Sequence, residues 1–60
     1  MEKELLKSRI KSHAEWVDYY LSAYERGIEV GSVHSAERAR DDAAKHAAIL
    51  TALLAISAGT

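Results

Sequence analysis

Apolar residues recur every three or four positions along most of this chain, which is the spacing of one face of an α-helix. Steps of four and three residues alternate, as they do at the a and d positions of packed helices. In the first half of the chain this row consists of Leu6, Ile10, His13, Val17, Tyr20 and Tyr24. In the second half it consists of Ala36, Arg40, Ala43, Ala47, Leu50 and Leu54. The pattern predicts two amphipathic helices whose apolar rows face each other.

Glycine and serine punctuate the chain at one internal place. There is no proline, and the first residue that interrupts a helical pattern is Gly27, followed closely by Gly31 and Ser32. We expect Gly27 to take the left-handed conformation just past the end of the first helix. Either Ser32 or Ser35 would then cap the second helix.

The resulting prediction is an all-α, antiparallel two-helix hairpin that forms a single domain over residues 1–60. The first helix is expected over about residues 2–26, the loop over 27–32 and the second helix over about 33–58. Large residues of the first helix then face small residues of the second near the loop, which permits close helix packing. The expected pairs are Tyr24 with Ala36, Tyr20 with Arg40, Val17 with Ala43, His13 with Ala47, Ile10 with Leu50, and Leu6 with Leu54.

The C-terminal part of the second helix is apolar on every side, since residues off the main row are also hydrophobic. Such a helix must be surrounded, and one partner helix cannot surround it. A chain of 60 residues without cysteine also lacks the disulfides that stabilise many small folds. We therefore expect self-association into a four-helix-bundle dimer or a larger helical oligomer. The predicted interface consists of Ile49, Leu50, Leu53, Leu54 and Ile56.

The charge and the N-terminal residues bear on the expected partners and cellular location of the chain. The formal net charge is −1, so the chain casts no strong field toward nucleic acid or anionic lipid. The first residues, Met1, Glu2, Lys3 and Glu4, are not followed by an apolar run that could serve as the core of a signal peptide. We therefore expect a cytoplasmic protein. The apolar segment over residues 47–58 rises only about 18 Å as a helix, so membrane insertion is disfavoured against a contact between subunits.

Few residues suggest chemistry of their own. Asp42 and His46 lie four residues apart, a spacing that presents two ligands on one helical face, and His13 could approach them. Two ligands do not complete a zinc site, so we expect no metal and no cofactor. The serines lack a histidine and a carboxylate at suitable positions, and two helices offer no deep pocket. The sequence thus favours a protein that is not an enzyme.

A second strip on the first helix carries flat aromatic residues beside a cation. Aromatic residues next to arginine are typical of binding hot spots and of surfaces that stack nucleobases. The strip consists of Arg9, Ser12, Trp16, Tyr19 and Ala23. An alternative is that it forms the second packing face of a four-helix assembly.

Arg40 interrupts the apolar row of the second helix and therefore needs a partner. The ring or hydroxyl of Tyr20, the carboxylate of Asp18 and an anionic ligand are the candidates. We predict that Arg40 takes part in binding together with residues of the aromatic strip and with His13 and Tyr20 of the apolar row. The predicted binding residues are Arg9, His13, Trp16, Tyr19, Tyr20 and Arg40.

The shape predicted here resembles the Rop family of plasmid copy-number regulators, hairpins that dimerise into four-helix bundles and bind RNA. It is also similar in size and helix content to small phage-encoded hairpins that sequester nucleotide signals or block host complexes. Two functions follow as hypotheses. The first is a protein-binding module, an adaptor, regulator or inhibitor of phage or mobile-element type, which acts as a homo-oligomer on a larger protein. The alternative is an oligomeric hairpin that binds a nucleotide or RNA through Arg40 and the helix 1 aromatics.

Overall fold

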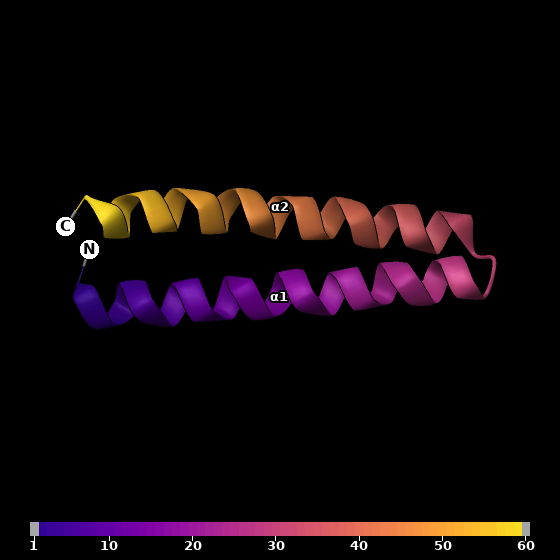
Figure 1. Ribbon diagram of the computed structural model, residues 1–60, viewed down its shortest axis with the longest axis horizontal. Helices are drawn as coiled ribbons and strands as arrows, with labels where there is room; N and C mark the ends of the chain where they lie inside the picture. The colour runs from indigo at the N-terminus through magenta and orange to yellow at the C-terminus, as the bar shows by residue number, and fades with distance from the viewer. Residues whose placement is uncertain (1, 60) are drawn as a thin grey trace.

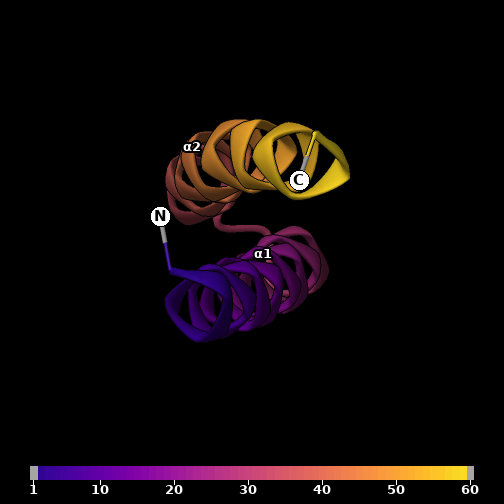
Figure 2. The same ribbon diagram turned by 90° about the vertical axis from the view of Figure 1, so that its left-hand side faces the viewer.

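The computed structural model describes residues 2–59 and contains two antiparallel α-helices. Helix α1 spans Lys3–Glu29 and helix α2 spans Val33–Ala58, and a short loop joins them at one end of the molecule (Figure 1). The molecule is a rod of 44 × 14 × 12 Å in which each helix has one neighbour, as the end view shows (Figure 2). The prediction of an all-α two-helix hairpin is confirmed.

Helix α1 ends at Glu29, later than the predicted end near residue 26. Gly27 is buried inside the helix and does not take the left-handed conformation expected for it. Gly31 takes that conformation, with φ of 75°. The Ser32 amide donates to the Gly27 carbonyl at 2.8 Å, and the Gly31 amide donates to the Ile28 carbonyl at 3.1 Å. This is the Schellman pattern, so the predicted type of helix end occurs at the second glycine of the loop region.

The packing of α1 on α2 explains why Gly27 belongs to the helix. A Cβ atom at this position would lie 3.0 Å from the backbone nitrogen and Cα atom of Ala36, so the two backbones would have to move apart by a few tenths of an ångström. Ala36 is itself only 1% exposed. The missing side chain therefore lets the two backbones approach each other beside the loop.

Helix α2 begins after Ser32, which occupies the N-cap position but makes no side-chain bond to a backbone amide. The Ser32 hydroxyl donates instead to the Ser35 hydroxyl at 2.9 Å. At the other end the Gly59 amide donates to the carbonyls of Ala55 and Ile56, at 3.1 and 3.2 Å. The start of α2 thus relies on packing more than on capping.

The row of α2 that faces α1 differs from the predicted row. The buried residues of α2 are Ala36, Ala39, Ala43 and Leu53. His46 and Leu50 are half-buried and continue the same alternation of three and four residues. The predicted residues Arg40 and Leu54 are exposed. Both rows are largely apolar because α2 is rich in alanine, and choosing Ala39 over Arg40 avoids the cost of burying a guanidinium group.

The corrected row also changes the cross-helix pairs. Tyr20 does not meet Arg40, and His13 hydrogen-bonds to His46 in place of packing on Ala47. The predicted pair of Leu6 with Leu54 fails because Leu54 is 50% exposed, whereas Leu53 is buried. In all three cases the observed α2 residue lies one position before the predicted one, whereas Ala36, Ala43 and Leu50 belong to both rows.

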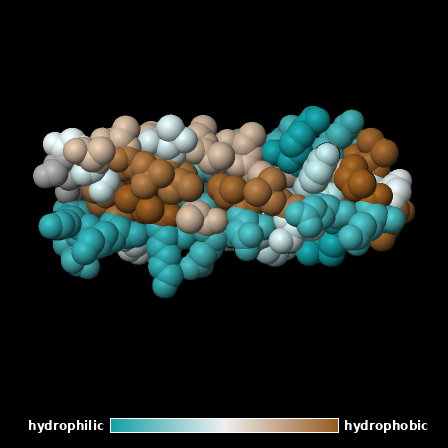
Figure 3. Space-filling view, viewed as in Figure 1, coloured by the Kyte–Doolittle hydropathy of each residue, from teal (hydrophilic) through white to brown (hydrophobic). Residues whose placement is uncertain are grey.

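The hairpin leaves much of its hydrophobic surface uncovered. Among the described residues, only Leu6 and Leu53 are large apolar side chains that the hairpin buries. Figure 3 shows hydrophobic side chains along the middle of one broad face, with hydrophilic side chains along the outer side of α1. No charged residue follows Lys45 in the sequence, so the C-terminal half of α2 has no charged outer side. The large exposed apolar residues are Leu5, Trp16, Tyr19, Leu21, Ile28, Val30, Val33, Ile49, Leu54 and Ile56.

A search of residues 2–59 for a helical stretch that is both long and apolar enough to cross a membrane finds none in either helix.

Replacement of Gly27 by alanine tests the close approach beside the loop. Alanine would normally strengthen a helix by about 1 kcal/mol, but here its Cβ would collide with the Ala36 backbone. Overpacking of this kind typically costs about 1–3 kcal/mol. We therefore expect Gly27→Ala to lower the free energy of unfolding, measured by urea denaturation with circular dichroism at fixed chain concentration.

The matched control is Gly59→Ala, whose added Cβ meets only carbonyl oxygens at 3.6 Å, an ordinary contact. This variant should unfold as the unmodified chain does. An increase in stability for Gly27→Ala would show that the helices are not in contact at this point.

Candidate binding surface

Two histidines connect the helices near the middle of the rod. The Nδ1 atoms of His13 on α1 and His46 on α2 lie 2.9 Å apart, which is hydrogen-bond distance. Both side chains are half-buried, and their ring centroids are 5.1 Å apart. One nitrogen must carry a proton and donate while the other accepts, so the bond requires at least one neutral ring. The two rings form a polar link within an otherwise apolar seam.

Aromatic rings of α1 surround the same histidine of α2. The ring of Trp16 lies 5.6 Å from that of His46, and the ring of Tyr20 lies 5.7 Å from it, both within 15° of parallel. Trp16 and Tyr20 are themselves 5.6 Å apart at 22°. His13, Trp16 and Tyr20 share one side of α1 because they lie three and four residues apart. Ring packing therefore restricts the orientation of the tryptophan.

Tyr19 extends this cluster toward solvent. Its ring stands nearly perpendicular to that of Trp16, at 84° and 5.6 Å, and nearly perpendicular to Tyr20, at 81° and 5.2 Å. Trp16 is 46% exposed and Tyr19 is 56% exposed. An open hollow on the surface is lined by Ser12, Glu15, Trp16 and Tyr19. We refer to these four residues as the aromatic hollow.

The structure brings together four of the six predicted binding residues. His13, Trp16, Tyr19 and Tyr20 belong to one ring cluster, together with His46, as the ring contacts above show. Arg9 is exposed, and it lies seven residues, or about two helical turns, before Trp16 on the same strip of α1.

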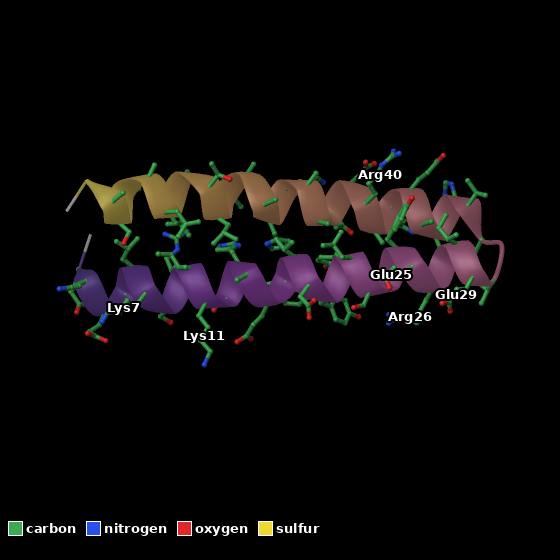
Figure 4. The ribbon with its side chains drawn as sticks, in the orientation of Figure 1. Lys7, Lys11, Glu25, Arg26, Glu29 and Arg40 are labelled. Atoms are coloured by element: carbon green, nitrogen blue, oxygen red, sulfur yellow. The ribbon has the colours of Figure 1, made fainter. Side chains whose placement is uncertain are left out.

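Arg40 does not join the cluster, which corrects the expectation that it would meet Tyr20 or Asp18. Its side chain projects from α2 away from α1 (Figure 4). The side chain is 63% exposed, and its nearest charged partner is Asp41 at 3.5 Å. An exposed pair of this kind contributes little to stability, about 0–1 kcal/mol. The arginine is solvated because α2 turns Ala39, and not residue 40, toward α1.

The predicted oligomer-interface residues divide into two groups. Leu53 is 4% exposed and Leu50 is half-buried, so both contribute to the contact between α1 and α2 of one chain. Ile49, Leu54 and Ile56 are 39%, 50% and 44% exposed, and they remain available to a second molecule.

The histidine pair does not extend to a set of metal ligands. No group of three or more histidine, cysteine, aspartate or glutamate side chains in residues 2–59 is placed to hold a metal ion. His46, which the sequence pairs with Asp42, directs its Nδ1 to His13.

His46 is the member of the cluster that sequence reasoning did not include among the binding residues. It lies three residues after Ala43 and four before Leu50, so it fits the observed a/d row of α2. The sequence spacing therefore permits His46 in the facing row, but the predicted row through Arg40 and Ala47 excludes it. The structure turns Ala39, His46 and Leu53 toward α1, which distinguishes the observed row from the predicted one.

A double-mutant cycle tests whether the imidazole bond links the helices. Replacing His13 or His46 singly by leucine leaves the other, half-buried Nδ1 without its partner, which we expect to cost about 1 kcal/mol, the lower end of the range for buried groups. Replacing both removes the unsatisfied group, so we expect the double variant to be more stable than either single variant. Urea denaturation of the four proteins at equal concentration measures the coupling. Additive losses would show that the two rings do not interact.

Comparison with protein-family models, with curated protein sequences and with solved structures finds no match to this chain.

Proposed function

We propose that this chain is a non-enzymatic, cytoplasmic protein-binding module that works as a self-associated helical bundle. The observation that carries the proposal is the exposure of Trp16 and Tyr19 on a surface whose rings are held by their neighbours. Tryptophan and tyrosine dominate the binding energy of many protein interfaces. A ring that is already oriented loses little conformational freedom on binding, which favours affinity.

Self-association is supported by what one hairpin leaves uncovered. Within residues 2–59, three of the five hydrophobic side chains that the hairpin buries are alanines, which contribute little hydrophobic stabilisation per residue. Ile49, Leu54 and Ile56 remain exposed on a half-helix that carries no charge. Pairing two hairpins would cover these residues and produce the four-helix bundle that short hairpins commonly form.

A protein partner agrees better with the surface than a nucleotide or RNA does. Arg40 points away from the aromatic rings, so it cannot contribute to a phosphate site beside them. The charged residue that lines the aromatic hollow is Glu15, whose carboxylate repels phosphate. The near-neutral net charge of −1 adds no general attraction for a polyanion.

Charged substitutions on α2 test the assembly. Ile49→Glu and Ile56→Glu place a carboxylate on a surface that is exposed in the hairpin and covered in the proposed bundle. We expect each to shift light scattering toward the monomer mass, since burying an unpaired charge is costly. Leu53→Glu should instead abolish helicity, because Leu53 is buried within the hairpin.

Ala44→Glu serves as the control for the assembly experiment. Residue 44 is exposed and lies before Lys45, in the charged half of α2. This variant should scatter light as the unmodified chain does. If the unmodified chain is monomeric at all accessible concentrations, the bundle part of the proposal is wrong.

Tyr19→Ser tests protein binding through the aromatic surface. The immobilised chain should retain a defined set of proteins from a cell extract, and Tyr19→Ser should lose them while keeping its circular dichroism spectrum. Leu21→Ser is the matched control, because Leu21 is an apolar residue of α1 with similar exposure, 47% against 56%. Mass spectrometry identifies the retained proteins. If the Tyr19→Ser variant retains the same proteins as the unmodified chain, this surface has no binding role.

A further inference from the structure

We infer that the aromatic hollow receives an arginine side chain of the partner protein. This inference rests on the proposed protein-binding function and specifies the chemistry of the partner at that surface. Four features carry it: two aromatic walls, a carboxylate at the rim, the lack of an internal cation for that carboxylate, and a hydroxyl beside it.

The aromatic walls come from Trp16 and Tyr19. Their rings form a T-shaped pair at 84° with centroids 5.6 Å apart, so the edge of one ring meets the face of the other. Roughly half of each side chain is exposed. The face of an aromatic ring carries negative potential and attracts a cation placed within about 6 Å of the ring centroid. The exposed part of these ring faces therefore favours a cation over an anion.

Glu15 adds a full negative charge to the same hollow. Within residues 2–59 the carboxylate of Glu15 forms no ion pair, although Lys11 lies one turn earlier on α1. Lys11 projects from α1 away from α2, into solvent (Figure 4). The charge of Glu15 is therefore free to pair with a cation supplied from outside the chain.

Arginine fits this combination better than lysine. A guanidinium is planar and can stack on an indole or phenol ring while its edge donates several hydrogen bonds. In the hollow those acceptors are the carboxylate of Glu15 and the hydroxyl of Ser12. An ammonium group offers a point charge with no flat face, so it would use the carboxylate but not the ring stacking.

The probe for this inference is N-acetyl-arginine amide, with N-acetyl-citrulline amide as its neutral control of nearly the same shape. Trp16 is the only tryptophan, so its fluorescence and its indole N–H resonance report on the hollow without ambiguity. We expect the arginine amide to shift both signals saturably at millimolar concentration in low salt, while the citrulline amide leaves them unchanged. Equal shifts from the two amides, or no shift from either, would overturn the inference.

Variants of the full chain locate the charge that is responsible. Glu15→Gln should weaken binding of the arginine amide about threefold, as expected for the loss of an exposed ion pair. Glu37→Gln is the control, because residue 37 is an exposed carboxylate on α2 outside the hollow. Equal affinity for the Glu15→Gln variant and the unmodified chain would also overturn the inference.

The outcome is separable from that of the proposed function. If the arginine amide fails to bind while Tyr19→Ser still abolishes protein retention, the surface binds a partner through another side chain. If the amide binds while Tyr19→Ser retains every protein, the hollow recognises guanidinium but the proposed protein binding is wrong.

Discussion

The distance between the two helix backbones beside the loop constrains the rest of the molecule. Gly27 and Ala36 meet there without room for another carbon atom. Because α1 and α2 are joined at this end, their close contact sets which residues of α2 turn toward α1 farther along the rod. Ala39 and Ala43 continue the contact, half-buried rings such as Tyr20 and His46 fill the middle of the rod, and Leu53 is buried toward the termini. Small residues thus determine the register, and large ones add the hydrophobic stabilisation.

The register in turn creates the imidazole pair. With Ala39 against α1, His46 reaches the seam and meets His13 at 2.9 Å. A polar contact inside an apolar seam commonly selects one alignment of helices over its neighbours, and here a slip of one residue would separate the two half-buried rings. The rings of Trp16 and Tyr20 pack around His46. The aromatic surface therefore depends on an alignment that alanine and glycine establish several turns away.

The sequence predicted the two helices, their antiparallel arrangement and the α1 residues of the cluster, because the a/d spacing of α1 has only one apolar solution. It did not predict the facing row of α2, because Ala47 and Leu54 of the predicted row are together as apolar as Ala39 and Leu53 of the observed row. The row predicted from the sequence therefore includes Arg40. The sequence also predicts a helix end at Gly27, because glycine more often ends a helix than permits a close contact within one. In both cases the deciding factor is the approach of another helix, which local sequence does not encode.

The arrangement of the chain ends bears on how this protein can be handled. Helix α1 starts and helix α2 finishes at the same end of the rod, beside the uncharged half of α2 (Figure 1). An affinity tag or fluorescent fusion at either terminus would therefore sit next to Leu5, Leu54 and Ile56, and could mask or imitate association. At the opposite end no atom lies within 4 Å of the position that a side chain would take at Gly31, but the φ of 75° at this residue strains any residue other than glycine. A reporter attached at that end would therefore have to preserve both the turn at Gly31 and the contact of Gly27 with Ala36, which sets the register of the rod.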